Sequence, residues 1–220
     1  MIGLSNNKEF LRLSVFFLWL INVSGFFGIT SDQSEFFLST TPYVLSLTLL
    51  LLILNHDLSD KKSKIGLILV VLFGLIVEIL GVNYGLFFGE YSYGANLGPK
   101  IYEVPFVIGL NWVLLIIATG SISDKLIKGK EIFKILFASF LMVLIDLLIE
   151  QSAPKLDYWE FIISPVPFSN YLWWFIFSLC FQYIFFKTVK TKEYNLSSNI
   201  LVIQFLFFGM LAVLVGCKKI

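Results

Sequence analysis

The sequence predicts an all-α integral membrane protein, a polytopic bundle of about seven transmembrane helices. Hydrophobic residues make up 58% of the 220-residue chain and charged residues only 14%, and the mean hydropathy is +0.87. A soluble domain of this size cannot bury so much apolar surface, so much of it must face lipid. Apolar stretches of about 20 residues, the length that a helix needs to cross the hydrocarbon core, also recur along the chain. We therefore treat residues 1–220 as a single integral-membrane domain.

Seven apolar segments are long enough to span a membrane: residues 10–28, 36–55, 65–83, 105–123, 132–150, 169–187 and 197–216. Lipid offers the backbone no hydrogen-bond partner and the segments lack the alternation of a β-barrel, so each is predicted to be helical. The first segment follows Lys8 and Arg12, as in a signal peptide. It lacks a small-residue cleavage site, so we expect a retained helix.

The basic residues predict the orientation. Most of them fall on one side of a seven-span arrangement: Lys8, Arg12, Lys61, Lys62, Lys64, Lys125, Lys128, Lys130, Lys134, Lys187, Lys190 and Lys192. The other side receives Lys100, Lys155, Lys218 and Lys219. The positive-inside rule then puts the N-terminus in the cytoplasm of, we expect, a bacterial inner membrane. The long loops 84–104 and 151–168 consequently lie together on the outer side.

Charge and composition exclude several classes of partner. A net charge of +1 provides no field that would attract nucleic acid. The two cysteines, Cys180 and Cys217, form neither a disulfide framework nor a CxxC motif. His56 is the only histidine, which argues against a histidine-rich metal or haem site. We expect no metal and no cofactor.

Glu78 begins the stretch in which polar, glycine and aromatic residues are most concentrated, which ends near Asn111. A charged side chain at the centre of a membrane helix costs roughly 2.5–3.5 kcal/mol, so acids are rare there. Glu78 is therefore either a protonated or paired acid that faces the bundle interior, or a glutamate near the interface that reaches water. Gly81, Gly85 and Gly89 are spaced for one helical face. They either open a groove for a ligand or let helices pack closely.

Asp146 and Glu150 are four residues apart, so both carboxyl groups share one helical face. Two neighbouring acids repel, which favours a proton donor beside an acceptor; alternatively, Glu150 is only a charged residue at a helix end. Such a pair can also hold Mg²⁺ and a prenyl diphosphate, as in a Mg-dependent prenyltransferase-like enzyme, but that site requires two acidic clusters. Asn111 either orients a water or carboxyl group or makes an inter-helix hydrogen bond. With Glu78, these residues place polar groups of three consecutive helices in one outer layer.

Aromatic residues are frequent in and beside the two outer loops. They include Tyr91, Tyr93, Tyr102, Trp159, Trp173 and Trp174. They form either an interfacial aromatic belt or aromatic faces that line an apolar substrate and stabilise a developing cation.

Two blocks of residues resemble the carotenoid biosynthesis protein family, which includes carotenoid 1′,2′-hydratases and bisanhydrobacterioruberin hydratases. The first block contains Glu78, Gly81, Gly85, Gly89, Tyr91, Tyr93, Leu97, Gly98, Val104, Pro105 and Trp112. The second contains Asp146, Glu150, Ala153, Pro154, Asp157, Tyr158, Trp159, Val166, Pro167, Asn170, Tyr171 and Trp174. Together they span residues 78–174.

The resemblance implies a membrane-dissolved carotenoid as substrate and a hydro-lyase that adds water to its terminal C1′,C2′ double bond without a cofactor. On this hypothesis Glu78 or Asp146 donates the proton, Glu150 acts on the water, and Asn111 holds that water. The expected substrate contacts are Gly85, Tyr91, Tyr93, Trp112, Trp159 and Asn170.

Two other functions remain open. One is a non-catalytic carotenoid-binding or assembly protein that works with other enzymes of the pathway. The other is a transporter, for which the sequence shows no internal repeat.

Overall fold

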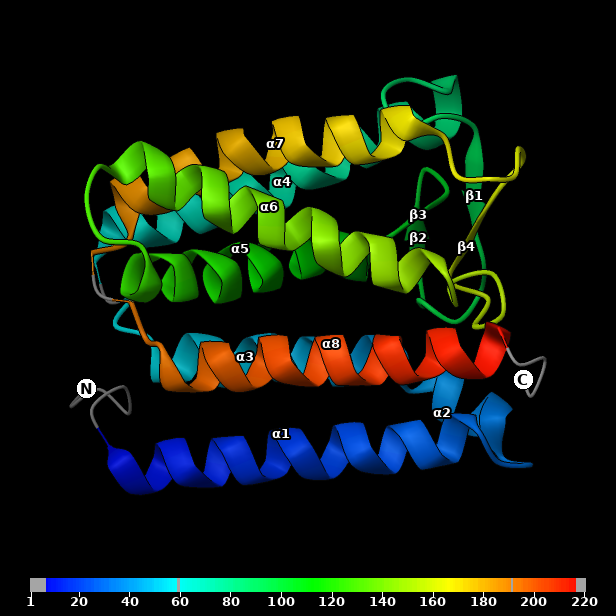
Figure 1. Ribbon diagram of the computed structural model, residues 1–220, viewed down its shortest axis with the longest axis horizontal. Coiled ribbons are helices and arrows are strands. Elements are labelled where there is room, and N and C mark those ends of the chain that lie inside the picture. Colours follow the sequence, from blue (N-terminus) through cyan, green and yellow to red (C-terminus); the bar gives the residue numbers. More distant parts are fainter. Residues whose placement is uncertain (1–6, 59, 191, 217–220) are drawn as a thin grey trace.

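The computed structural model describes residues 7–58, 60–190 and 192–216, which form a bundle of helices with short strands at one end (Figure 1). The helices are α1 (Lys8–Ile29), α2 (Ser34–Ser39), α3 (Thr41–Asn55), α4 (Lys61–Tyr84), α5 (Phe106–Leu126), α6 (Glu131–Glu150), α7 (Phe168–Thr188) and α8 (Asn195–Gly216). The strands are β1 (Tyr91–Tyr93), β2 (Lys100–Ile101), β3 (Val104–Pro105) and β4 (Trp159–Phe161). We call the end of the bundle with the strands the strand end. The opposite end, where the connections α3–α4, α5–α6 and α7–α8 lie, is the lysine end.

The predicted helical class is confirmed, and within the described residues five helices are long and apolar enough to cross a membrane. These are α1, α4, α5, α6 and α8. The short helix α3 has only 15 residues, and α7, with 21, is not among the five. The count of seven spans and the cytoplasmic N-terminus therefore stay predictions.

The segment predicted as one helix over residues 36–55 is two helices. The chain breaks at Thr40, which ends α2 and precedes α3. Pro42 explains the break, because its ring has no N–H to donate and clashes with the carbonyl group four residues earlier in a continuous helix. At the first turn of α3, by contrast, the missing N–H costs nothing.

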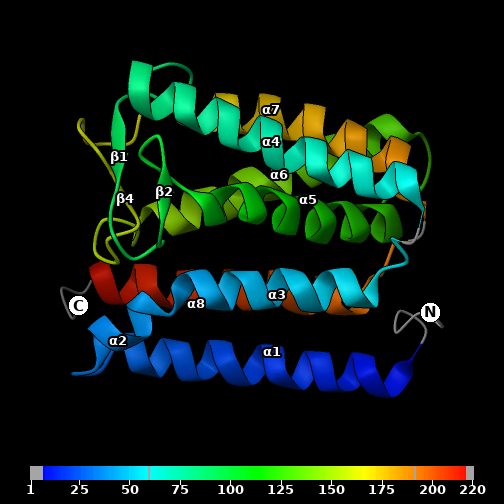
Figure 2. The same cartoon turned by 180° about the vertical axis from the view of Figure 1, so that it is seen from behind.

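Helix α5 is the centre of the bundle. It packs against α3, α4, α6, α7 and α8. Of its 18 most apolar consecutive residues 83% are buried, against 11% for the corresponding residues of α1. Figure 2 shows α1 as the outer layer on one side of the bundle, beside α3 and α8, and α4 and α7 on the opposite side. Residues on α5 therefore meet side chains from most of the bundle.

Glycine and proline set the helix ends next to the site. Helix α4 ends at Gly85, whose φ of +63° lies in the left-handed region that glycine adopts readily. Gly89 consequently lies beyond the helix, and the expectation that Gly81, Gly85 and Gly89 share one helical face is wrong. Pro105 and Pro167 directly precede α5 and α7, where their fixed φ suits a helix start.

The two long loops come together at the strand end. Strands β1 and β4 pair antiparallel, with Tyr91 opposite Phe161 and Tyr93 opposite Trp159. This pairing joins loop 84–104 to loop 151–168, which the sequence placed on the same side. Lys218 and Lys219, two of the basic residues on which the predicted orientation depends, lie outside the described residues.

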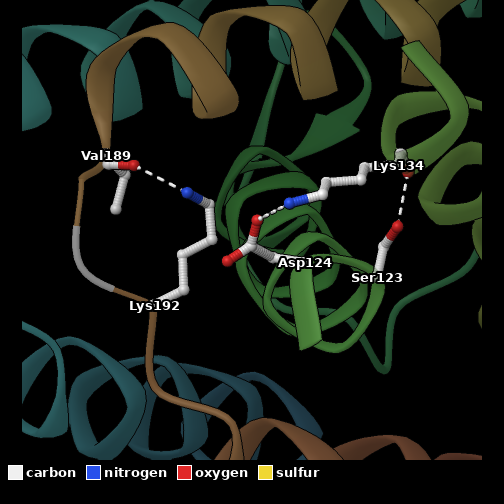
Figure 3. A network of polar contacts seen from close by, with 5 residues as sticks. All are labelled: Ser123, Asp124, Lys134, Val189 and Lys192. Atoms are coloured by element: carbon white, nitrogen blue, oxygen red, sulfur yellow. Dashed lines mark hydrogen bonds and ion pairs between the residues drawn. The ribbon is translucent and has the colours of Figure 1, made fainter. Parts of the chain in front are cut away.

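The lysine end is held by a polar network (Figure 3). Lys134 on α6 forms an ion pair of 2.8 Å with Asp124 on α5, and the Ser123 hydroxyl donates to the Lys134 carbonyl oxygen at 2.6 Å. The Lys192 ammonium donates to the Val189 carbonyl oxygen at 3.0 Å. Burial lowers the pKa of Lys192. Acids and lysines thus lie close together at this end.

Candidate active site

Glu78 faces the bundle interior and is held by three donors. The residue is 2% exposed. Oε2 accepts hydrogen bonds from the Tyr91 hydroxyl at 2.6 Å and the Tyr93 hydroxyl at 2.8 Å. Oε1 accepts one from the Trp112 indole nitrogen at 3.1 Å. Glu78 is therefore a buried, anchored acid rather than one that reaches water.

The two tyrosines reach Glu78 because of the strand that carries them. Successive side chains of a strand point to opposite faces, so Tyr91 and Tyr93 share the buried face of β1. Burial, followed by the neighbouring Glu78 carboxyl, raises the pKa of both phenols above their ordinary value, so both keep the proton that they donate. A Cβ atom at Gly81 would lie 2.9 Å from the Tyr91 hydroxyl oxygen. Glycine at this position is what lets the phenol approach α4.

Trp112 connects Glu78 to an aromatic stack. The indole is fully buried and stacks on Trp174 of α7, with ring centroids 4.2 Å apart and an interplanar angle of 18°. Phe181 meets it edge-on at 5.2 Å. Such contacts fix the ring and thereby the direction of its N–H. Gly74 leaves room for the indole on α4, since a Cβ there would lie 2.9 Å from the ring.

Asp146 and Glu150 form a second acidic group that shares one amide. Both are buried, at 2% and 7% exposure. The Asn170 side-chain nitrogen donates to Asp146 Oδ2 at 2.9 Å and lies 3.4 Å from Glu150 Oε1. Asn170 begins α7 just after Pro167, so this helix start aims the amide at the end of α6. The two carboxyl groups therefore share one neutral amide donor.

All three acids line one small cavity. Its walls also include Asn111, Asn170, Trp174, the two tyrosines of β1 and Trp159 and Phe161 of β4. The cavity is about 30 Å³, close to the volume of one water in the liquid and enough to hold one. No side-chain hydrogen bond joins Asn111 to another described residue, so its amide is available to such a water. Glu78, Asn111, Asp146 and Glu150 were predicted to meet in one layer, and all four line this cavity.

The remaining predicted contacts divide into two groups. Trp112, Trp159 and Asn170 touch or line the acidic site. Gly85 does not line the cavity, since it is exposed at the end of α4. Tyr102 is 75% exposed and likewise lies away from the acids. Gly85 thus has a local structural reason to be glycine.

The hydroxyl donors to Glu78 are what the sequence reasoning missed. The sequence predicts Tyr91 and Tyr93 as part of an aromatic belt or as aromatic faces, not as hydrogen-bond donors. The Tyr-x-Tyr spacing was a usable signal, since period two predicts a shared face. Asn170 was expected against substrate, whereas its amide holds the acidic pair. Among the described residues, no group of three or more His, Cys, Asp or Glu is arranged to hold a metal ion.

Comparison with known proteins points to one pathway. The model of the family described as carotenoid biosynthesis protein matches residues 39–219. A bisanhydrobacterioruberin hydratase from Haloarcula japonica is 25% identical over 126 residues, which cover 54% of this chain and 43% of that protein. The chain thus matches less than half the length of this relative. No solved structure matches.

Proposed function

The chain belongs to the carotenoid biosynthesis protein family, and we propose that it is a hydro-lyase that adds water to the terminal C1′,C2′ double bond of an acyclic carotenoid. The observation that carries this proposal is a set of three buried acids around a cavity with room for one water. Hydration of an alkene needs a proton donor, a base and a water, and this cavity brings those groups together. Its aromatic walls suit an apolar substrate that arrives from lipid.

The first step is proton transfer to C2′. Two carboxyl groups that share the Asn170 amide repel when both are ionised, and one proton between them removes that repulsion. Asp146, the deeper of the pair, donates this proton, and the π electrons of the double bond form the new C–H bond. The charge then rests on C1′ as a tertiary carbocation. Nearby ring faces of Trp174 and Trp159 stabilise it, as aromatic faces do for cations.

The second step consumes the cation. Water held by Asn111 bonds through its oxygen to C1′, and Glu150 takes the proton that the water loses. Proton exchange between Glu150 and Asp146 restores the pair, so the net change is the addition of one water. Glu78, held by Tyr91 and Tyr93, exchanges no proton, and its carboxyl group stabilises the cation electrostatically.

The acidic site lies toward the outer side of a bacterial inner membrane in this proposal. The support is the concentration of basic residues at the lysine end. Single cysteines at Tyr102, in the strand end, and Lys128, in the lysine end, test it after Cys180 and Cys217 are replaced by serine. A membrane-impermeant thiol reagent should label intact cells at position 102 and not at 128. The reverse pattern would invert the orientation.

A carotenoid-binding or assembly protein is the alternative. It is favoured by a separate apolar cavity of about 80 Å³ that adjoins the acidic one. A binder needs that cavity but gains nothing from burying acids, whose transfer into an apolar interior is costly. The alternative therefore leaves the three acids without a role.

Expression in a host that makes lycopene or γ-carotene tests the proposal. Mass analysis of the pigments should show a product heavier by one water. Asp146→Asn should lower product formation by about 10²–10⁴-fold, because the amide cannot supply the proton. Unchanged pigment in cells that contain folded wild-type protein would refute hydration, and pigment that co-purifies unchanged would favour the binder.

A further inference from the structure

The apolar cavity lies at the strand end, between α1, α3 and α8 on one side and α5 and α6 on the other. Its lining includes Ile21 and Gly25 of α1, Val44 of α3, and Phe207 and Phe208 of α8. Pockets that enclose a whole drug-sized ligand measure roughly 300–1,000 Å³, so a cavity of about 80 Å³ has room for only one end of a long molecule.

This cavity shares walls with two neighbours. Ile108, Asn111, Ile149 and Trp159 line both it and the acidic cavity. On the other side, Asn22 and Phe207 line both it and a third cavity of about 140 Å³ between α1 and α8. The third cavity is walled almost wholly by apolar side chains, several of them exposed on the lipid-facing surface: Val23, Phe27, Leu206 and Met210. The three cavities thus form a series from the bundle surface to the acids.

Side-chain hydrogen bonds hold the first half of α1 to the bundle, whereas the cavities lie beside its second half. Near the lysine end, the Trp19 indole donates to Asn199 on α8 at 2.8 Å, and the Asn55 amide of α3 donates to Ser14 at 2.9 Å. Beyond Asn22, no hydrogen bond between described side chains joins the rest of α1 to α3 or α8. Apolar contacts alone hold that half, and such contacts can open to admit a hydrocarbon.

We propose that a linear conjugated hydrocarbon enters between α1 and α8 and passes its end group through the apolar cavity to the acids, with the rest of the chain left in lipid. This inference rests on the proposed function for the identity of the end group that reacts. Asn111 and Trp159 separate the last two cavities, so they meet the end group as it reaches the water. Helix α1, which lies outside the matched residues 39–219, is thereby part of the substrate site.

Gly25→Trp tests this route. A Cβ atom at Gly25 meets nothing within 4 Å, so the indole fills the cavity rather than clashing with the backbone. Gly209→Trp is a matched control, because Gly209 on α8 also has open space around it and lines none of the three cavities. Gly25→Leu replaces the tryptophan variant if that variant does not accumulate in the membrane.

Two readouts separate the route from the chemistry, namely pigment that co-purifies with the protein and hydrated product in the cells. Gly25→Trp should lose both, Gly209→Trp should keep both, and Asp146→Asn should keep pigment and lose product. Wild-type pigment and product in folded Gly25→Trp would overturn the route, as would purified wild-type protein that carries lipid acyl chains in place of pigment. Loss of pigment in Gly25→Trp without product from any variant would leave the route standing and refute hydration.

Discussion

The two ends of the bundle treat their acids in opposite ways. At the lysine end, Asp124 pairs with Lys134 at 2.8 Å and Glu131 with Lys187 at 2.7 Å, and all four side chains are partly exposed. At the strand end, Glu78, Asp146 and Glu150 are buried, and their hydrogen-bond partners among the described residues are neutral Tyr, Trp and Asn side chains. Within the described part of the chain, no lysine or arginine forms an ion pair with any of these three.

On the proposed mechanism, this difference separates structural acids from reactive ones. A lysine partner stabilises the ionised form of a carboxylate and so disfavours proton uptake. A neutral donor positions the carboxyl group without fixing its charge. Burying three acids without cations is costly for the fold, and functional sites are where such costs are tolerated. The comparison therefore predicts that substitutions at the two ends change different properties.

After Asp146→Asn, Glu78→Gln gives the largest expected effect. The amide keeps the size of the side chain, but it cannot ionise. Its NH₂ group, a donor, would also face the donors Tyr91, Tyr93 or Trp112. We expect hydration to fall by about 100-fold, within the range for loss of a group that stabilises the transition state electrostatically, when product is measured by mass in carotenoid-producing cells. The matched change at the lysine end, Glu131→Gln, should leave hydration unchanged. Equal effects at both positions would remove the distinction between the two ends.

A pH-sensitive group at the lysine end gives the next effect. His56 is buried, with Nδ1 at 2.9 Å from the Leu52 carbonyl oxygen. That nitrogen must donate, so Nε2 accepts from the Ser121 hydroxyl at 3.2 Å and the Glu193 amide at 3.1 Å. Burial lowers the pKa of His56 from 6.5 to about 4. The neutral ring thus joins α3, α5 and the α7–α8 connection.

Acid should weaken this junction. Between pH 6.5 and about 4, the unfolded chain binds a proton at His56 that the folded protein does not, so stability falls as the pH falls, by about 1.4 kcal/mol per unit. Above pH 6.5 this residue makes no contribution to the pH dependence. Thermal unfolding in detergent should therefore be less pH-dependent in His56→Gln than in the wild type across this window. An unchanged slope would show that His56 already titrates normally in the fold.

The helices and the acidic layer could be predicted from the sequence because both follow from hydropathy. Apolar runs of about 20 residues located every long helix, and the basic residues separated the two ends. Glu78, Asp146 and Glu150 were identified because an acid within an apolar run is conspicuous by itself. Depth along a helix follows from counting residues at about 1.5 Å each, so their common layer was also predictable.

The partners of these acids depend on contacts that are distant in sequence. Tyr91 reaches Glu78 only because β1 pairs with β4, and three-residue strands carry too little periodicity to predict pairing across about 70 residues. The break at Thr40 was signalled by Pro42, but the apolar residues on both sides of it favoured a single span. The cavities could not be predicted at all, since they depend on how side chains from many helices and both loops fill the space.

Tyr91→Phe should have a smaller effect than loss of the acid itself. It removes one hydrogen bond of 2.6 Å to Glu78 and leaves those from Tyr93 and Trp112. A hydrogen bond contributes about 0.5–1.5 kcal/mol, so we expect up to roughly a tenfold lower rate of hydration with the protein still folded. Tyr194→Phe, at the lysine end, is the control, because its ring lies under Lys125 and keeps that contact without the hydroxyl. If both variants hydrate like the wild type, the phenols do not position Glu78.

The smallest effect should come from the ion pair between Asp124 and Lys134. Their side chains are 35% and 22% exposed, and partly exposed pairs contribute only about 0–1 kcal/mol. Asp124→Asn combined with Lys134→Gln should therefore lower the unfolding temperature slightly and leave hydration unchanged. The pair between Lys187 and Glu131 is more exposed, at 50% and 41%, so its removal should cost still less. Comparison of each single variant with the double variant isolates the pair, and a loss of hydration in either double variant would mean that the lysine end contributes to the reaction.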